Sequence, residues 1–212
     1  MDKSKIDYTL YLCTDRGLMS CETIEQSVEE GVKGGCTVIQ LREKDCTSRE
    51  FYELAVRVKK ITDKYNVPLI INDRLDIAQA VDCAGVHLGQ SDMPCAVARK
   101  ILGEDKIIGI SAATLEEAKK AQADGADYLG VGAMYATTKT DARAVTREQL
   151  VEIRAAVDIP IVIIGGVNQK TVPNFKGMGI DGAAVVSAVV SQPDIEKAAK
   201  DLRELCEDCF GR

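Results

Sequence analysis

Short apolar runs alternate along the chain with longer stretches in which apolar and polar residues are mixed. The runs are rich in Val, Ile and Leu, which is typical of strands that are buried on both faces. They predict eight strands, at Thr9–Cys13, Val38–Leu41, Leu69–Ile71, Gly85–Leu88, Ile107–Ile110, Tyr128–Val131, Ile161–Ile164 and Ala183–Val186.

The stretches between these runs carry apolar residues at the spacing of one helix face. The longest starts at Ser48, ends at Tyr65 and places Phe51, Leu54 and Val58 on one side. Similar patterns predict helices over Thr23–Lys33, Thr146–Val157 and Asp194–Cys206, one from a Thr114–Glu117 capping box, one after Pro94, a short one over Asp76–Val81, and a weak one over Gln169–Met178 that contains Pro173.

The regular alternation predicts the fold. Parallel strands need crossover connections, and eight parallel strands close into a barrel filled by side chains. We therefore expect an α/β protein with a single (β/α)₈ barrel, formed by residues 1–212 as one catalytic domain. An open, doubly wound sheet is the alternative, but its glycine-rich turn is absent after the first strand, where the chain reads Cys13-Thr14-Asp15-Arg16-Gly17.

Composition narrows the function. The net charge of −6 argues against nucleic acid or an anionic membrane as the main partner, but not against a small anionic substrate. The eight cysteines and one histidine show no zinc pattern, which favours reduced cysteines in the cytoplasm. Because neither a signal peptide nor a membrane-length apolar run is present, we expect a cytoplasmic protein; the sequence leaves homo-oligomer formation open.

Polar residues gather where the predicted strands end, which is the active-site face of such a barrel. The second strand runs into Gln40-Leu41-Arg42-Glu43-Lys44. Strand alternation puts Gln40, Arg42 and Lys44 on one side and Leu41 on the other. One amide and two cations suit a phosphate or diphosphate group, although a solvated ladder of surface charges is the alternative.

Two carboxylates follow neighbouring strands. Asp73 lies after the third strand, next to Asn72, and Asp92 lies after the fourth. Mg²⁺ is typically held by one or two carboxylates, waters and substrate phosphate oxygens, so the pair predicts a Mg²⁺–diphosphate site. The alternatives are that Asp92 caps the helix after Pro94 and that Asp73 pairs with Arg74.

The later strands end in small and hydroxyl-bearing residues. Ser111 ends the fifth strand, and Gly166 and Ser187 follow the seventh and eighth. Loops at these last two positions form the recurrent phosphate site of the fold through backbone amides. The loop after the sixth strand carries Lys139 and is either a substrate contact or an ordinary flexible loop. Two anion sites suggest two phosphorylated substrates.

The only histidine, His87, lies within the fourth predicted strand. It is either a general base or, as we favour, a buried structural histidine.

Together these motifs resemble those of the thiamine-phosphate synthase family. The resemblance runs in order from about residue 8 to 190. Its segments are Gln-Leu-Arg-Glu-Lys at 40–44, Ile-Asn-Asp-Arg at 71–74, Gly-Val-His-Leu-Gly-Gln-Ser-Asp-Met-Pro at 85–94, Lys-Thr-Asp-Ala from 139, Ile-Gly-Gly-Val at 164–167 and Val-Val-Ser at 185–187.

The resemblance implies a transferase of thiamine biosynthesis that couples a hydroxymethylpyrimidine diphosphate to a hydroxyethylthiazole phosphate, giving thiamine phosphate and diphosphate. It implies Mg²⁺ as cofactor, held by Asp73 and Asp92. The pyrimidine diphosphate would contact Gln40, Leu41, Arg42, Glu43, Lys44, Asn72, Ser111 and Lys139, of which Arg42, Lys44, Ser111 and Lys139 would be catalytic. The thiazole phosphate would contact Thr137, Thr138, Gly166, Val186 and Ser187.

Three other functions remain open. A thiazole tautomerase with the same barrel, or a phosphate-sugar enzyme such as an epimerase, would have no use for a metal–diphosphate site. A non-catalytic module that binds a phosphorylated ligand would have no reason to keep the two carboxylates.

Overall fold

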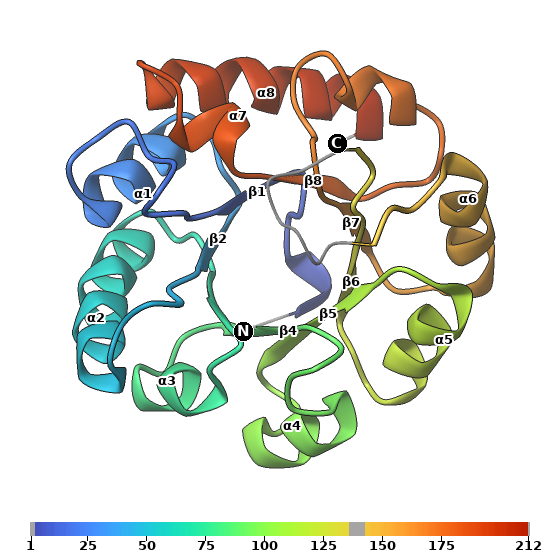
Figure 1. Ribbon diagram of the computed structural model, residues 1–212, viewed down its shortest axis with the longest axis horizontal. Coiled ribbons are helices and arrows are strands. Elements are labelled where there is room, and N and C mark those ends of the chain that lie inside the picture. The colour runs from blue at the N-terminus through green and yellow to red at the C-terminus, as the bar shows by residue number, and fades with distance from the viewer. Residues whose placement is uncertain (1–2, 136–142, 212) are drawn as a thin grey trace.

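The computed structural model describes residues 3–135 and 143–211. Eight parallel strands form a closed barrel in chain order, and the barrel closes where β1 pairs with β8. Figure 1 shows this ring of strands inside a ring of helices. The predicted (β/α)₈ fold is confirmed. The strands are β1 Leu10–Cys13, β2 Val38–Leu41, β3 Leu69–Asn72, β4 Gly85–Leu88, β5 Ile107–Ala112, β6 Tyr128–Val131, β7 Ile161–Ile163 and β8 Gly182–Val185.

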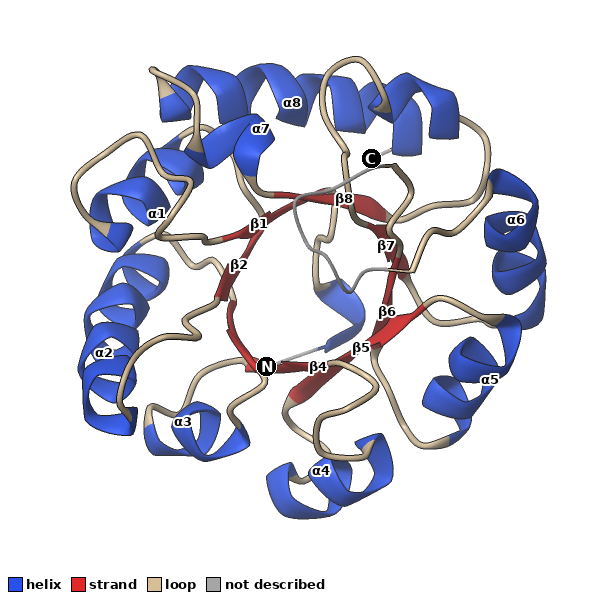
Figure 2. Cartoon of the chain, viewed as in Figure 1, coloured by secondary structure: helices blue, strands red, loops and turns tan. Residues whose placement is uncertain are grey.

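Helices connect most strands and cover the barrel from outside (Figure 2). They are α1 Ile24–Lys33, α2 Ser48–Lys64, α3 Leu75–Ala80, α4 Cys95–Leu102, α5 Leu115–Ala123, α6 Arg147–Ala156, α7 Ser187–Val190 and α8 Ile195–Phe210, with short 3₁₀ helices η1 Lys3–Lys5 and η2 Val172–Phe175. No helix among the described residues is long and apolar enough to cross a membrane.

One predicted helix is wrong and one cap differs. Between β7 and β8 the expected helix over Gln169–Met178 shrinks to η2, with Pro173 in its first turn. Proline removes a backbone donor, so it favours a short turn over a full helix here. The Thr114 side chain accepts from the Glu117 amide, but the Glu117 carboxylate accepts from Ala113 instead of completing a capping box.

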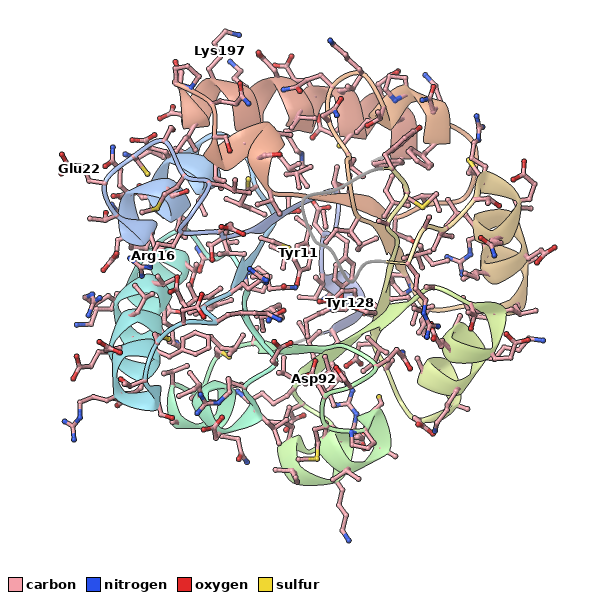
Figure 3. The ribbon with its side chains drawn as sticks, in the orientation of Figure 1. Tyr11, Arg16, Glu22, Asp92, Tyr128 and Lys197 are labelled. Carbon is pink, nitrogen blue, oxygen red and sulfur yellow. The ribbon has the colours of Figure 1, made fainter. Side chains whose placement is uncertain are left out.

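Strand alternation creates two separate cores. Leu41 and the outward-facing residues of the other strands pack against the helices. The inner core fills the barrel with Tyr8, Tyr11, Ile70 and Tyr128, among others. Figure 3 shows Tyr11 and Tyr128 inside the ring of strands.

The N-terminal segment closes one end of the barrel. Ile6, just after η1, packs against the inner core, and Lys3 pairs with Asp127 before β6 at 2.8 Å. Figure 1 shows η1 within the outline of the barrel. The carboxyl ends of the strands, with the predicted site residues, therefore form the opposite end.

Candidate active site

The segment after β2 is tied to the end of β1. The Thr14 amide donates to the Gln40 carbonyl, and the Arg42 amide donates to Thr14 Oγ1, both at 3.0 Å. The Arg42 guanidinium lies 3.4 Å from Asp15. Since strong charge-assisted hydrogen bonds are about 2.7–2.9 Å long, this pairing is loose and leaves the guanidinium able to turn toward an anion.

The other residues of this segment take different places. Lys44 is half exposed, and its ammonium lies 3.8 Å from Asp73. Leu41 is buried in the outer core, so its side chain does not reach the mouth of the barrel. The Glu43 carboxylate accepts from Arg16 at 3.1 Å, and its second oxygen is buried without a hydrogen-bond partner among the described residues.

Asp73 and Asp92 come together at the ends of β3 and β4, as the sequence predicts. Asp73 has a left-handed backbone, with φ of 62°, and its amide donates to the His87 carbonyl at 2.9 Å. Asp92 accepts from the Gly89 amide at 2.7 Å. Left-handed non-glycine residues are uncommon and concentrate at functional sites.

The two acids influence each other electrically. Burial raises the pKa of Asp73, and the nearby negative charge of Asp92 raises it further, while Lys44 and Arg42 offset only part of the shift. Both alternative interpretations fail. Pro94, not Asp92, stands at the start of α4, and Arg74 pairs with Asp76 rather than with Asp73.

This pair fits a hard divalent cation. Two repelling carboxylates provide oxygen ligands, and a cation between them would relieve the repulsion. Within residues 3–135 and 143–211, no cluster of three or more His, Cys, Asp or Glu is arranged to hold a metal. A metal here would thus rely on water and substrate oxygens, as Mg²⁺ characteristically does.

Amide and hydroxyl side chains line the same side of the mouth. Gln40 and Asn72 are buried at the ends of β2 and β3. Ser111, half-buried on β5, has its hydroxyl 2.9 Å from His87 Nε2, and its carbonyl accepts from Gln90 at 2.6 Å. Gln40, Asn72 and Ser111 thus come from the same strand ends, or neighbouring ones, as the two cations and the two carboxylates.

The backbone after β7 and β8 has the features expected of the second anion site that the sequence predicts. Gly165 and Gly166 have φ of 91° and 67°, which a side chain would strain. In α7 the first helical hydrogen bonds come from Val189 and Val190 to the Val186 carbonyl. The Ser187 amide precedes these bonds, so its N–H has no acceptor within the helix.

The loop after β6 lies in the sequence between Ser111 and the glycines after β7. Thr137, Thr138 and Lys139 lie outside the described residues. Beside them, the Tyr135 amide donates to Gly165 at 3.0 Å and Ala133 donates to Arg143 at 2.7 Å. The loop therefore starts beside the β7 glycines.

Comparison with known proteins identifies the family. The sequence model described as thiamine monophosphate synthase matches residues 10–189. The chain belongs to the thiamine monophosphate synthase family. It is therefore a transferase of thiamine biosynthesis, with small-molecule substrates and metal-assisted chemistry.

Individual relatives agree with this family assignment. The chain is 61% identical to thiamine-phosphate synthase of Clostridium beijerinckii over 202 residues, covering 95% of this chain and 97% of that one. It is 59% identical to the enzyme of Ruminiclostridium cellulolyticum, covering 96% and 97%. Thiamine phosphate pyrophosphorylase from Pyrococcus furiosus has a TM-score of 0.90 at 41% identity, covering 97% of this chain and 98% of that one.

Sequence reasoning missed part of this thiamine monophosphate synthase site. Gln40 donates to the Tyr11 hydroxyl, and His87 contacts Tyr128 and Ser111 through hydrogen bonds. The two tyrosines lie within predicted buried strands. Because a buried phenol usually has a hydrogen-bond partner, the sequence could have predicted that each hydroxyl forms a hydrogen bond. The partners themselves depend on strand register, which the sequence does not show.

Proposed function

We propose that the protein couples 4-amino-5-hydroxymethyl-2-methylpyrimidine diphosphate to hydroxyethylthiazole phosphate, releasing diphosphate and forming thiamine phosphate. The observation that carries this proposal is the meeting of Asp73 and Asp92 with Arg42 and Lys44 at one side of the mouth. The backbone at Gly166, on the other side, is proposed to bind a second phosphate.

We propose Mg²⁺ as the metal, held by Asp73 and Asp92. When bound, it would neutralise charge that grows on the departing diphosphate. Arg42 and Lys44 bind the same group from the β2 end, and Lys139, outside the described residues, is proposed to do so from the loop. Asn72 and Gln40 orient the pyrimidine diphosphate, with the backbone of Leu41 and Glu43 beside it.

The reaction breaks the bond between the pyrimidine methylene carbon and the diphosphate oxygen. The electron pair leaves with diphosphate, and the aminopyrimidine stabilises the resulting cation. The thiazole nitrogen then donates its lone pair to form the new carbon–nitrogen bond, so no protein nucleophile is required. The protein's contribution is to stabilise the leaving group and to hold the thiazole close.

The thiazole phosphate is proposed to lie against the β7 and β8 ends. Gly166, Val186 and Ser187 contact its phosphate through backbone amides and one hydroxyl, and Thr137 and Thr138 are proposed to join them from the loop. We also propose that residues 1–212 act as one catalytic barrel in the cytoplasm, where the eight cysteines, none of which forms a disulfide among the described residues, would stay reduced.

Calorimetry with inorganic diphosphate distinguishes this proposal from the tautomerase and the epimerase. A coupling enzyme should bind diphosphate much more tightly with Mg²⁺ than without it, and Asp92→Asn should reduce the difference, because only Asp73 remains as a carboxylate ligand. Asp63→Asn, at an exposed pair with Lys59, is the matched control and should behave as wild type. Metal-independent binding, or none, would count against the coupling reaction.

A further inference from the structure

A chain of hydrogen bonds crosses the interior of the barrel and ends at Ser111. Gln40 Nε2 lies 2.8 Å from the Tyr11 hydroxyl, which lies 2.7 Å from the Tyr128 hydroxyl. The Tyr128 hydroxyl is 2.9 Å from His87 Nδ1, and His87 Nε2 is 2.9 Å from Ser111 Oγ. The chain therefore links β2, β1, β6, β4 and β5 in one path.

The chain has a direction because its first member can only donate. The Gln40 amide nitrogen has no lone pair to accept with, so Tyr11 accepts from it and passes its own hydrogen to Tyr128. Tyr128 then donates to His87 Nδ1. With Nδ1 accepting, the hydrogen of a neutral imidazole lies on Nε2 and is donated to Ser111.

A doubly protonated His87 would break this order. Both ring nitrogens would donate, so Tyr128 would have to donate to Tyr11, which already accepts from Gln40. The Tyr11 hydrogen would then have no acceptor within the chain, at a residue only 1% exposed. Stranding a buried polar hydrogen is costly. Burial also raises the pKa of both phenols well above their ordinary value, so each keeps its proton.

Two glycines make room for the rings of this chain. A Cβ on Gly109, which pairs with Tyr128 in the β5–β6 register, would lie 2.1 Å from the Tyr128 ring. A Cβ on Gly130 would lie 3.0 Å from His87 Cε1. Side chains at either position would displace the rings. The two glycines therefore support the placement of the Tyr128 and His87 rings by an observation that is separate from their hydrogen bonds.

We propose that Tyr11, Tyr128 and His87 are positioning residues that make Ser111 a committed hydrogen-bond donor to the pyrimidine diphosphate. Because Ser111 accepts from His87, its own hydrogen points elsewhere, and Ser111 stands at the mouth beside the diphosphate side of the site. His87 uses both ring nitrogens in this arrangement and has no lone pair left to act as a general base. The inference rests on the proposed placement of the pyrimidine diphosphate at the β2–β5 ends.

Nitrogen NMR tests the direction of the chain without any substrate. His87 is the only histidine, so ¹⁵N-histidine labelling gives a single imidazole. At neutral pH the wild-type protein should show a protonated Nε2 and an unprotonated Nδ1. A protonated Nδ1, alone or together with Nε2, would overturn the proposal whether or not the enzyme turns over.

A double-mutant cycle tests the link to Ser111. Ser111→Ala should lower kcat/KM for the pyrimidine diphosphate about 10- to 150-fold, and Tyr128→Phe about 2- to 10-fold, with the KM for thiazole phosphate unchanged. In the Ser111→Ala background, Tyr128→Phe should have no further effect, because Tyr128 acts through Ser111. Additive losses would show a merely structural tyrosine and overturn the proposal.

Tyr65→Phe is the matched control for Tyr128→Phe. The Tyr65 hydroxyl donates a hydrogen bond to Glu29 in the layer of helices and is not part of the hydrogen-bond chain from Gln40 to Ser111. Therefore kcat/KM should stay at the wild-type value. Were Tyr128→Phe to fold poorly, the wild-type nitrogen spectrum would still decide the direction of the chain.

Discussion

Single residues at the mouth of the barrel are expected to act in two different ways. Arg42, Lys44 and Asp73 are proposed to bind the diphosphate, whose charge grows as it departs, so their contacts should strengthen in the transition state and their loss should lower kcat. Gly166 and Ser187 are proposed to face a phosphate whose charge stays constant. They provide uniform binding, and their loss raises KM.

Asp73→Asn should lower kcat by about tenfold or more, the scale of one lost charged contact. Raising the Mg²⁺ concentration should recover part of the loss, since Asp92 remains as a ligand. Steady-state kinetics across a Mg²⁺ series checks this, with Asp63→Asn as the control. An effect confined to the KM for thiazole phosphate would reverse our division of the site.

Ser187→Ala should mainly raise the KM for thiazole phosphate, by about 10- to 150-fold for one hydrogen bond to a charged group. Ser27→Ala is a suitable comparison, because the buried Ser27 hydroxyl has no hydrogen-bond partner among the described residues and lies on α1. If Ser187→Ala instead lowered kcat at saturating thiazole phosphate, the assignment of a binding role would be wrong.

For single residues, the sequence predicts those contacts that depend only on where a residue lies along its strand. Arg42, Asp73 and Asp92 follow strands whose ends must share one edge, so their meeting was predictable from strand order. The Tyr11–Tyr128 contact was not, because it depends on which interior positions face each other across the barrel. That register appears only when the sheet closes.

At the scale of elements, close packing between strands sets what each position tolerates. Gly109 on β5 is required because the Tyr128 ring occupies the space beside it. The sequence predicted both strands but gave no reason for this glycine. Similarly, the Pro173 segment was expected to be a helix, and only the structure shows that a short turn suffices between β7 and β8.

Gly109→Ala should destabilise the protein by about 1–3 kcal/mol through overpacking of the barrel interior. Urea unfolding measures this difference. Gly17→Ala is the control, since the nearest atom to an added Cβ there is 3.5 Å away and the change should be nearly neutral. Equal stability of the two variants would mean that the interior is looser than the structure shows.

Asp7 ties the start of β1 to α8. Burial alone would raise the pKa of Asp7, but hydrogen bonds from the Thr9 hydroxyl and amide and the charge of Arg203 outweigh it and lower the pKa. A carboxyl with a lowered pKa in the folded state stabilises the protein above the unfolded-state pKa, about 3.9, and loses that contribution as pH falls through the folded-state pKa.

Asp7→Asn should therefore reduce the free energy of unfolding at pH 7. The difference from wild type should hold down to about pH 5 and shrink below about pH 4. Urea titrations of both proteins across this range provide the check. A difference that grows on acidification would contradict the cause given for the lowered pKa.

At the scale of the whole molecule, the alternation of strands and helices was sufficient to predict the barrel. Eight buried runs with crossovers leave few other parallel topologies, and the observed strands differ from the predicted ones only at their ends. The same order places the residues of the two proposed anion sites on opposite parts of one mouth. Their joint presence is what a coupling reaction between two phosphorylated substrates requires.

The formation of thiamine phosphate by the purified protein tests this account most directly. With both phosphorylated precursors and Mg²⁺, we expect thiamine phosphate, detected by its oxidised fluorescence, and diphosphate in equal amounts. EDTA should stop the reaction and added Mg²⁺ should restore it, while either precursor alone should give no product. Full activity after rigorous removal of metal, or no product with both precursors and Mg²⁺, would contradict the account.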